Sequence, residues 1–422
     1  MMARASLDRG SIPPLDAMAS RFRELYGGAT EPDIFFAPGR VNLIGEHTDH
    51  NGGHVLPCAI SLGIWAMVAP RTDDVVRLWS MSFADLAPVE ATSRGLRRCD
   101  GLGWANYPLG AIRALEDRGM ALPRGLDVLF YADLPEGAGL SSSAAIEVLT
   151  VRAANDIFGL GLDGTQIAQI AQEAEVRFIG VPCGIMDQFV VSTGKRDHAT
   201  LLDCATLEHE HVPLDLKQDG RQCRIVITDS GVSREVSASE YGLRRRQCEA
   251  ALEDVRRVRP EVRALCELSE EGLAEVAGAI EDPVLFRRAR HAVTEDARTL
   301  AAAEALRSGD MRELGRLMKA SHLSLRDDYE VTGPELDTLA ELAWGWPGVL
   351  GSRMVGAGFG GCTVSIVEAS AIDGFIHEVS AGYARRTGRE ARFFLVRTEE
   401  GARRIEGAGW AWRSTSTTSS RG

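Results

Sequence analysis

LPEGAGLSSSAAIEV, residues 134–148, is the stretch that decides the fold of this chain, because it joins a strand to a helix through a glycine- and serine-rich loop. The preceding run LDVLFYADL, at 126–134, is mostly apolar and predicts a strand. Residues 144–159 repeat apolar side chains at helical spacing and predict an amphipathic helix. The N–H groups and dipole at the start of such a helix bind anions. The stretch therefore predicts an anion site, with phosphate as the candidate ligand.

The loop itself carries two glycines and three serines. Gly137 and Gly139 allow the backbone to approach phosphate oxygens without a Cβ in the way. The serines at 141–143 can cap the helix, donate to phosphate or bind Mg²⁺. An ordinary serine-capped helix is the alternative, but a cap needs one serine, so three favour phosphate. The loop lacks the lysine of a Walker A motif and the third glycine of a dinucleotide fingerprint.

A second polar cluster lies upstream in GRVNLIGEHTDHNGGHVLP, residues 39–57. It contains three histidines with two carboxylates between them: His47, His50, His54, Glu46 and Asp49. These are residue types that Zn²⁺ prefers. The turn signal at 51–53 stands between two apolar runs, and a chain that reverses there spreads the imidazoles apart. We therefore favour a polar ligand site over a zinc cage.

A third stretch, QEAEVRFIGVPCGIMDQFVV at 172–191, contains two acidic candidates. Glu175 stands in the last turns of a predicted helix, where a carboxylate opposes the dipole unless a cation is near, or else is a solvated surface side chain. Asp187 stands among apolar residues, where a carboxylate is costly to bury alone. It is either a structural turn cap or a general base with a cation such as Arg40 beside it. Phosphoryl transfer needs phosphate donors, Mg²⁺, a cation and a positioned nucleophile.

A literal G-x-G-x-x-G occurs in GSRMVGAGFGGCTVSIV, residues 351–367. A strand-like run follows it, and the dinucleotide fingerprint requires a helix there. The stretch is either a tight connection into a core strand or a glycine loop packed against the phosphate loop.

The bulk properties exclude several classes of function. The 422 residues suffice for two domains, and a net charge of −13 argues against a nucleic-acid or anionic-membrane surface. Eight cysteines without a C-x-x-C pair are typical of reduced cytosolic thiols. The start of the chain lacks a signal-peptide pattern and no apolar run is long enough to span a membrane, so we expect a cytoplasmic protein.

The sequence pattern of the chain changes near residue 215. A strand at 224–230 leads into helix-rich, Arg-rich sequence, and a glycine-rich strand with one helix–strand pair follows. The pattern predicts two α+β domains, 15–215 and 216–405, and a low-complexity, disordered tail at 406–422.

Together these stretches resemble the GHMP kinases and, within them, the galactokinases. PGRVNLIGEHTDHNGG resembles the sugar signature, PEGAGLSSSAA the ATP loop and GAGFGGCTV the third motif, and the similarity runs from about Ala37 to Gly401. The resemblance implies an N-terminal domain with a left-handed βαβ unit, like domain 2 of ribosomal protein S5, and a C-terminal ferredoxin-like domain. It implies transfer of the γ-phosphoryl group of ATP to the anomeric hydroxyl of galactose, with Mg²⁺, and no nucleic-acid or membrane partner. We expect a monomer.

The resemblance also implies roles for single residues. Asp187 is the implied base and Arg40 the implied transition-state cation. The implied sugar ligands are Glu46, His47, Thr48, Asp49, Gly184 and Tyr241. The implied ATP-phosphate loop consists of Gly137, Ala138, Gly139, Leu140, Ser141, Ser142 and Ser143. Ser143 and Glu175 are the implied Mg²⁺ ligands.

The chain departs from the family pattern at a few positions. His50 stands where galactokinases usually have Tyr, and Ala357 replaces a glycine of the third motif. A protonated His50 beside the sugar would attract an acidic sugar such as galacturonate. The nearest alternative is a sister sugar-1-kinase that acts on galacturonate, arabinose or N-acetylgalactosamine. A catalytically inactive sugar-sensing relative is another alternative, but the intact Arg40, Asp187 and serine loop argue against it.

Overall fold

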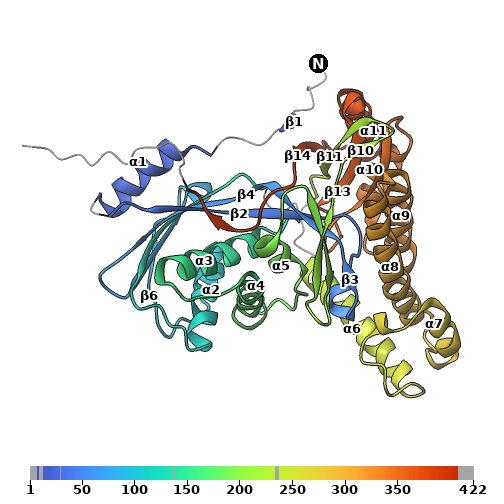
Figure 1. Cartoon of the computed structure of the whole chain (residues 1–422), viewed down its shortest axis with the longest axis horizontal. Coiled ribbons are helices and arrows are strands. Elements are labelled where there is room, and N and C mark those ends of the chain that lie inside the picture. The colour runs from blue at the N-terminus through green and yellow to red at the C-terminus, as the bar shows by residue number, and fades with distance from the viewer. Residues whose placement is uncertain are drawn as a thin grey trace, which may run out of the picture.

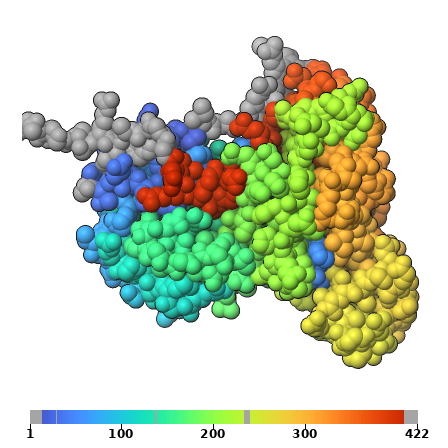
Figure 2. Space-filling model, in the orientation of Figure 1, coloured from blue at the N-terminus to red at the C-terminus, as the bar shows by residue number. Residues whose placement is uncertain are grey.

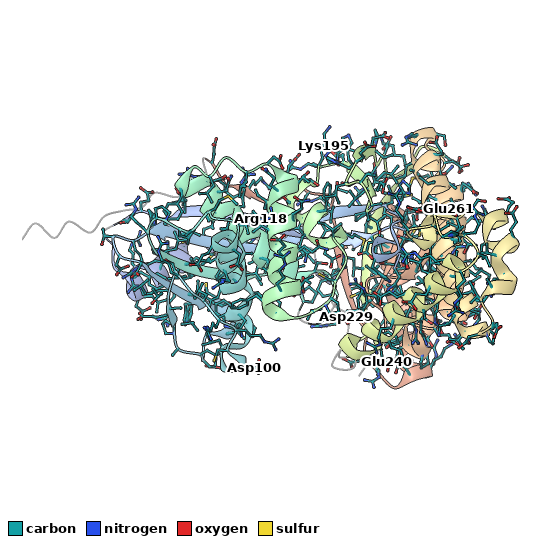
Figure 3. All side chains as sticks on the ribbon, turned by 90° about the horizontal axis from the view of Figure 1, so that it is seen from below. Asp100, Arg118, Lys195, Asp229, Glu240 and Glu261 are labelled. Atoms are coloured by element: carbon teal, nitrogen blue, oxygen red, sulfur yellow. The ribbon has the colours of Figure 1, made fainter. Side chains whose placement is uncertain are left out.

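The computed structural model describes residues 7–8, 13–28, 30–135, 137, 139–232 and 237–406. They form two α+β units side by side, with helices α2 to α5 in the first and α6 to α11 in the second (Figure 1). Figure 3, seen from below, places Asp100 and Arg118 in the first unit and Asp229, Glu240 and Glu261 in the second. Ala138 and all but the first residue of the expected tail lie outside the described residues.

The first unit is built on a sheet with the strand order β15-β2-β4-β7-β5-β6. Its strands are β2 (Asp33–Asn42), β4 (Pro57–Pro70), β5 (Val75–Ser80), β6 (Val89–Thr92), β7 (Leu126–Ala132) and β15 (Arg403–Arg404). All pairs are antiparallel except β5 with β7, which the chain connects through β6 and α2. The strand and helix expected on either side of the serine loop are β7 and α3.

Helices cover both faces of this sheet. Those on the loop side are α2 (Asn106–Asp117), α3 (Ser142–Phe158), α4 (Gly164–Glu173) and α5 (Met186–Thr193). On the other face α1 (Leu15–Tyr26) buries Met18 and Phe22 against Ile34 and Leu129. Because both faces are covered, β2 is buried along almost its whole length. A small second sheet, β3 (His54–Val55), β8 (His198–Asp203) and β9 (His209–Pro213), stands beside it.

The sheet of the second unit has the order β1-β14-β11-β13-β12, with β10 (Lys217–Gln218) paired to β11. Its strands are β1 (Leu7–Asp8), β11 (Arg221–Asp229), β12 (Val349–Met354), β13 (Cys362–Glu368) and β14 (Arg392–Val396). The four longer strands are antiparallel and lie in the order fourth, first, third, second of their chain sequence. That order is ferredoxin-like, as predicted.

The described part of the second unit contains five long helices and a short one. They are α6 (Ser237–Arg256), α7 (Glu270–Val276), α8 (Pro283–Ser308), α9 (Met311–Ser324), α10 (Gly333–Trp344) and α11 (Ile372–Thr387). Helices α10 and α11 pack on one face, α9 packs on β12, and α8 packs on α9. The segment around α7 projects from the body as a lobe (Figure 2). Among the described residues no helix is long and apolar enough to cross a membrane.

The first and the last described strands each pair with the sheet of the opposite unit. Residues 7–8 pair with β14 of the second sheet, and residues 403–404 pair with β2 of the first. The Ser61 amide also donates to the Arg397 carbonyl at 2.8 Å. The expected division at 215 and 405 therefore assigns the last strand to the wrong unit, because a two-residue edge strand has no sequence pattern that reveals its partner.

Candidate active site

The centre of the site is a buried ion pair between β2 and the first turn of α5. Arg40 Nε donates to Asp187 Oδ1 at 2.7 Å, and Nη2 donates to Oδ2 at 2.8 Å. Arg40 is 3% exposed, whereas the Asp187 side chain keeps 29% of its surface accessible. A bidentate guanidinium–carboxylate pair fixes both groups in one plane. The cation expected beside Asp187 is therefore present, and the carboxylate remains open to a substrate.

The glycine–serine loop closes over this pair. Arg40 Nη1 donates to the Gly139 carbonyl at 2.6 Å, and the Arg40 amide donates to the Leu140 carbonyl at 3.3 Å. A Cβ on Gly39 would lie 2.8 Å from the Leu140 oxygen, so this close approach needs glycine. Ser141 has φ 65° at the start of α3, and its hydroxyl donates to Asp187 instead of capping the helix. The three serines thus do not serve as one ordinary cap.

A pocket of buried acids lies next to the ion pair. Glu175, in the π-helical turn Ala174–Ile179, accepts a hydrogen bond from Gln188 Nε2 at 2.6 Å. Burial and the negative charge of Asp187 raise the pKa of Glu175 to about 7, against the opposing effect of the Ser143 hydroxyl. The structure therefore brings both expected Mg²⁺ ligands to the side of Asp187.

Glu147, on α3, belongs to the same pocket and was not expected from the sequence. It is fully buried, and neither carboxylate oxygen has a hydrogen-bond partner among the described residues. Burial and the charge of Glu175 raise the pKa of Glu147 well above its usual range. The one signal in the sequence is a single acid inside the apolar run AAIEVLTV.

The donors in this pocket suit a hard cation. Buried carboxylate and hydroxyl oxygens are the ligands that Mg²⁺ takes, and orphaned carboxylate oxygens are costly without a positive charge. Within the described ranges no group of three or more His, Cys, Asp or Glu side chains has the geometry to hold a metal alone.

The polar loop at 45–51 lies against the second unit. Glu46 is 1% exposed and accepts hydrogen bonds from the Gly356 amide at 2.7 Å and from Arg353 Nη1 at 3.4 Å. Burial raises the pKa of Glu46, while the charges of Arg353 and Arg40 oppose the shift. The loop with the G-x-G-x-x-G pattern thus supports Glu46. It also leads directly into the buried strand β13, which is the first of the two alternatives that the sequence leaves open.

His47 is held by the same glycine loop. Its Nε2 lies 3.3 Å from the Ala357 carbonyl, and burial lowers its pKa well below the usual value, so the ring is neutral. The Nε2–H therefore donates to Ala357. Nδ1 is buried without a partner in the described part of the chain and is an acceptor available to a hydroxyl group.

Asp49 and Thr48 differ in orientation. A Cβ on Gly184 would lie 1.7 Å from Asp49 Oδ2, so the carboxylate rests directly on the backbone at 184. Tyr241, from α6, places its ring 5.5 Å from that of His47. The Thr48 hydroxyl instead bonds to the carbonyls of His54 and Gly45, at 2.6 and 2.9 Å, and holds the turn. The hydroxyl of Thr48 is thus engaged with the backbone, and its role as a sugar ligand stays a prediction.

The three histidines of the loop have separate partners. The rings of His47 and His50 are 5.9 Å apart and nearly perpendicular, and His50 Nδ1 lies 3.1 Å from Asp49 Oδ1. His54, in β3, points to α8, where its Nδ1 lies 3.0 Å from Asp296 Oδ1. The turn at 51–53 places His54 apart from the other two imidazoles, as the sequence predicts, whereas His47 and His50 stay in edge-to-face contact.

Helix α8 holds the polar loop from behind, which the sequence did not reveal. Glu295 Oε1 accepts from the amides of Gly45 and Glu46, at 3.0 and 3.3 Å. His291 Nε2 lies 3.0 Å from the Glu46 carbonyl. Both α8 side chains are fully buried, and burial lowers the pKa of His291 to about 4. Their i, i+4 spacing, which places them on one helix face, was the only available signal.

Comparison with protein families gives three matches along the chain. Residues 20–70 match the galactokinase galactose-binding signature. Residues 106–195 match the N-terminal domain of GHMP kinases, and residues 302–385 match the C-terminal GHMP kinase region. The first match contains the polar loop, and the second contains the serine loop and the acid pocket.

Individual proteins match almost the whole chain. A galactokinase of Clostridium acetobutylicum is 46% identical over 391 residues, which cover 93% of this chain and 99% of that protein. The crystal structure of Lactococcus lactis galactokinase complexed with galactose superposes with a TM-score of 0.89, at 39% identity over 93% of this chain and all of that one. The Methanococcus jannaschii mevalonate kinase shares the fold, with a TM-score of 0.63 and 17% identity.

Proposed function

The chain belongs to the galactokinase family of the GHMP kinases, and we infer from this that it transfers the γ-phosphoryl group of ATP to the anomeric hydroxyl of galactose, giving α-D-galactose 1-phosphate and ADP. One observation carries the inference from the site itself. The Arg40–Asp187 pair is bonded to the serine loop, and the charge of Arg40 acts on Glu46 of the polar loop, so an ATP phosphate and a sugar hydroxyl would meet at this pair.

Asp187 is the group that receives the sugar hydroxyl. Its carboxylate is the accessible member of the ion pair, and as a hydrogen-bond acceptor it orients the hydroxyl and can take its proton. The guanidinium charge of Arg40 offsets the negative charge on the phosphoryl group in the transition state of its transfer. The serine loop supplies backbone N–H groups at the start of α3 for the phosphates, through residues 139–143.

Magnesium completes the proposed site. Ser143 and Glu175 would hold the ion, and their oxygens, with the orphaned Glu147 nearby, fit a hard cation. Bound Mg²⁺ neutralises charge on the phosphate oxygens. A cytoplasmic location and a monomeric state remain proposals that rest on the cysteine usage and on the family.

Sugar recognition is assigned to the polar loop and its neighbours. Glu46, Asp49 and neutral His47 present acceptors, and the backbone at Gly184 and the Tyr241 hydroxyl border the same space. Several fixed acceptors suit a ligand with several hydroxyl groups. The acidic-sugar alternative has little support from His50, because both of its ring nitrogens lie against protein partners: Nδ1 against Asp49 and Nε2 against Tyr329.

A sugar panel tests the function. We expect ATP-dependent formation of a sugar 1-phosphate with galactose, at a higher kcat/KM than with galacturonate, arabinose or N-acetylgalactosamine. A higher kcat/KM for another member of the panel, or no ATP turnover with any of them, would show the proposal to be wrong.

The metal assignment predicts that Glu175→Gln weakens the binding of the divalent cation. We expect the Mg²⁺ concentration for half-maximal activity to rise by about tenfold, the change for losing one charged ligand contact. Binding of Mn²⁺ to the protein–ATP complex, followed by electron paramagnetic resonance, should weaken in parallel. Glu173→Gln is the matched control, because Glu173 pairs with Arg118 at the surface. Equal metal binding by both variants would contradict the assignment.

The phosphate loop predicts a nucleotide defect in Gly139→Val. Gly139 has φ 76°, which a β-branched residue does not adopt without strain, and a side chain there meets the phosphates. We expect ATP binding, measured by calorimetry, to weaken by at least about tenfold. The control is Gly309→Val, which imposes the same strain at φ 72° in open space after α8. Native ATP affinity in folded Gly139→Val would rule out the loop as the phosphate site.

A further inference from the structure

His50 occupies a closed position directly behind two proposed sugar ligands. Its side chain is 2% exposed. The ring Nδ1 lies 3.1 Å from Asp49 Oδ1 and 3.3 Å from the Tyr241 hydroxyl. On the opposite side of the ring, Nε2 lies 3.3 Å from the hydroxyl of Tyr329, which is fully buried. One imidazole therefore connects Asp49 in the loop after β2, Tyr241 in α6 and Tyr329 in the turn before α10.

The His50–Asp49 contact is a buried ion pair. Burial opposes the charge on His50, but the hydrogen bond and negative charge of Asp49 outweigh it and raise the pKa of His50 to about 9. Burial likewise opposes the charge on Asp49, and His50 lowers the pKa of that carboxyl in return. Both ring nitrogens are then donors. Nε2–H donates to the Tyr329 hydroxyl. That hydroxyl lies 3.3 Å from Cys248 Sγ and can in turn donate a hydrogen bond to the sulfur.

The two oxygens of Asp49 have different surroundings. Oδ1 receives the His50 backbone N–H at 2.9 Å and the ring Nδ1 at 3.1 Å. Oδ2 rests on the backbone of Gly184, with no side chain between them. His50 thus occupies one oxygen and leaves the other for a ligand.

We propose that His50 is a positioning residue: it holds the Asp49 carboxylate and the Tyr241 hydroxyl in the arrangement that receives the sugar, and it does not touch the sugar itself. The proposal rests on the proposed function, in which Asp49 and Tyr241 bind the substrate. It replaces the expectation that a charged His50 selects an acidic sugar. Nε2 points to Tyr329, and Nδ1 is already taken by Asp49.

Two amide substitutions test the contributions of the two ring nitrogens separately. Asn at position 50 places an amide N–H near the Nδ1 position and can still donate to Asp49. Gln reaches the Nε2 position and can bond Tyr329 but not Asp49. We expect His50→Gln and His50→Leu to raise the dissociation constant for galactose by about tenfold, as for a lost hydrogen bond to a charged group. His50→Asn should stay close to native, and ATP binding should be unchanged in all three variants.

Deoxygalactoses give a readout that a merely structural role would not change. The deoxy sugar that lacks the hydroxyl bound by Asp49 should bind equally well to native protein and to His50→Leu. Asp49→Asn should show the same pattern of losses across the 2-, 3-, 4- and 6-deoxy sugars. Tyr329→Phe, which removes only the partner of Nε2, is the control and should bind galactose almost normally. Thermal unfolding of each variant confirms that it is folded.

Three results would overturn the positioning role. The first is native affinity for galactose in both His50→Gln and His50→Leu, and the second is an equal loss of galactose affinity in His50→Asn and His50→Gln. The third is a pattern of affinities for the deoxy sugars in His50→Leu that differs from the pattern in Asp49→Asn. Failure of the proposed function looks different, because the native protein itself would then prefer another sugar. The same variants measured with that sugar would still test the role of His50.

Discussion

Replacing Asp187 by Asn is expected to lower the turnover number with galactose by about a hundredfold or more, the contribution of a positioned acid–base group. Asn keeps the size of the side chain but loses the charge, and it presents an N–H where Arg40 now donates to a carboxylate oxygen. The hydroxyl of the sugar then has no anionic acceptor. The dissociation constants for galactose and for ATP, each measured by calorimetry, should stay close to the native values.

Ser141→Ala is the matched control for this experiment. It removes the other side-chain donor to Asp187 but leaves the carboxylate and its pair with Arg40 in place. We expect a much smaller loss of turnover than in Asp187→Asn. If folded Asp187→Asn turns over galactose at nearly the native rate, Asp187 is a structural partner of Arg40 and another group receives the hydroxyl.

The second large effect is expected from Gly184→Ala. A Cβ at this position would lie 1.7 Å from Asp49 Oδ2 and 2.2 Å from its Cγ, so the carboxylate must leave its place. Asp49 then loses its alignment with the sugar, and we expect kcat/KM for galactose to fall by about a hundredfold, at the upper end for a charged hydrogen bond. ATP affinity should not change, because the serine loop is untouched.

A double-mutant cycle isolates the cause of that loss. In an Asp49→Gly background the carboxylate is gone, so Gly184→Ala has nothing to displace and should add little further loss. Full additivity of the two changes would mean that the alanine acts elsewhere, for example on the backbone of the loop. Unchanged galactose kinetics in Gly184→Ala alone would remove Asp49 from the sugar site.

Local patterns predicted the elements and the loops correctly. β7 and α3 flank the serine loop as the periodicity indicated, because alternating or helical apolar spacing depends only on neighbouring residues. The turn at 51–53 separates His54 from His47 and His50 for a similar local reason. The identity of the site came from the resemblance of whole motifs, and the fold class agrees with the family matches and with the ferredoxin-like order of the second sheet.

Residues that act across the two units were not predictable in this way. Glu295 and His291 on α8 hold the polar loop from about 250 positions away in the chain, and Glu147 is an orphaned acid only because helices surround it. No local pattern records which distant groups a side chain will meet.

The orientation of single side chains was likewise decided by tertiary structure. The sequence groups Thr48 with Glu46 and Asp49 as sugar ligands and places His50 beside them as a departure from the family pattern. In the folded chain Thr48 turns inward to backbone carbonyls and His50 turns to Tyr329, while Asp49 rests on Gly184. The sequence by itself determined which residue types gather at the site. Only packing decided which of them face the ligand, because a buried polar group must point to whatever partner the surrounding elements provide.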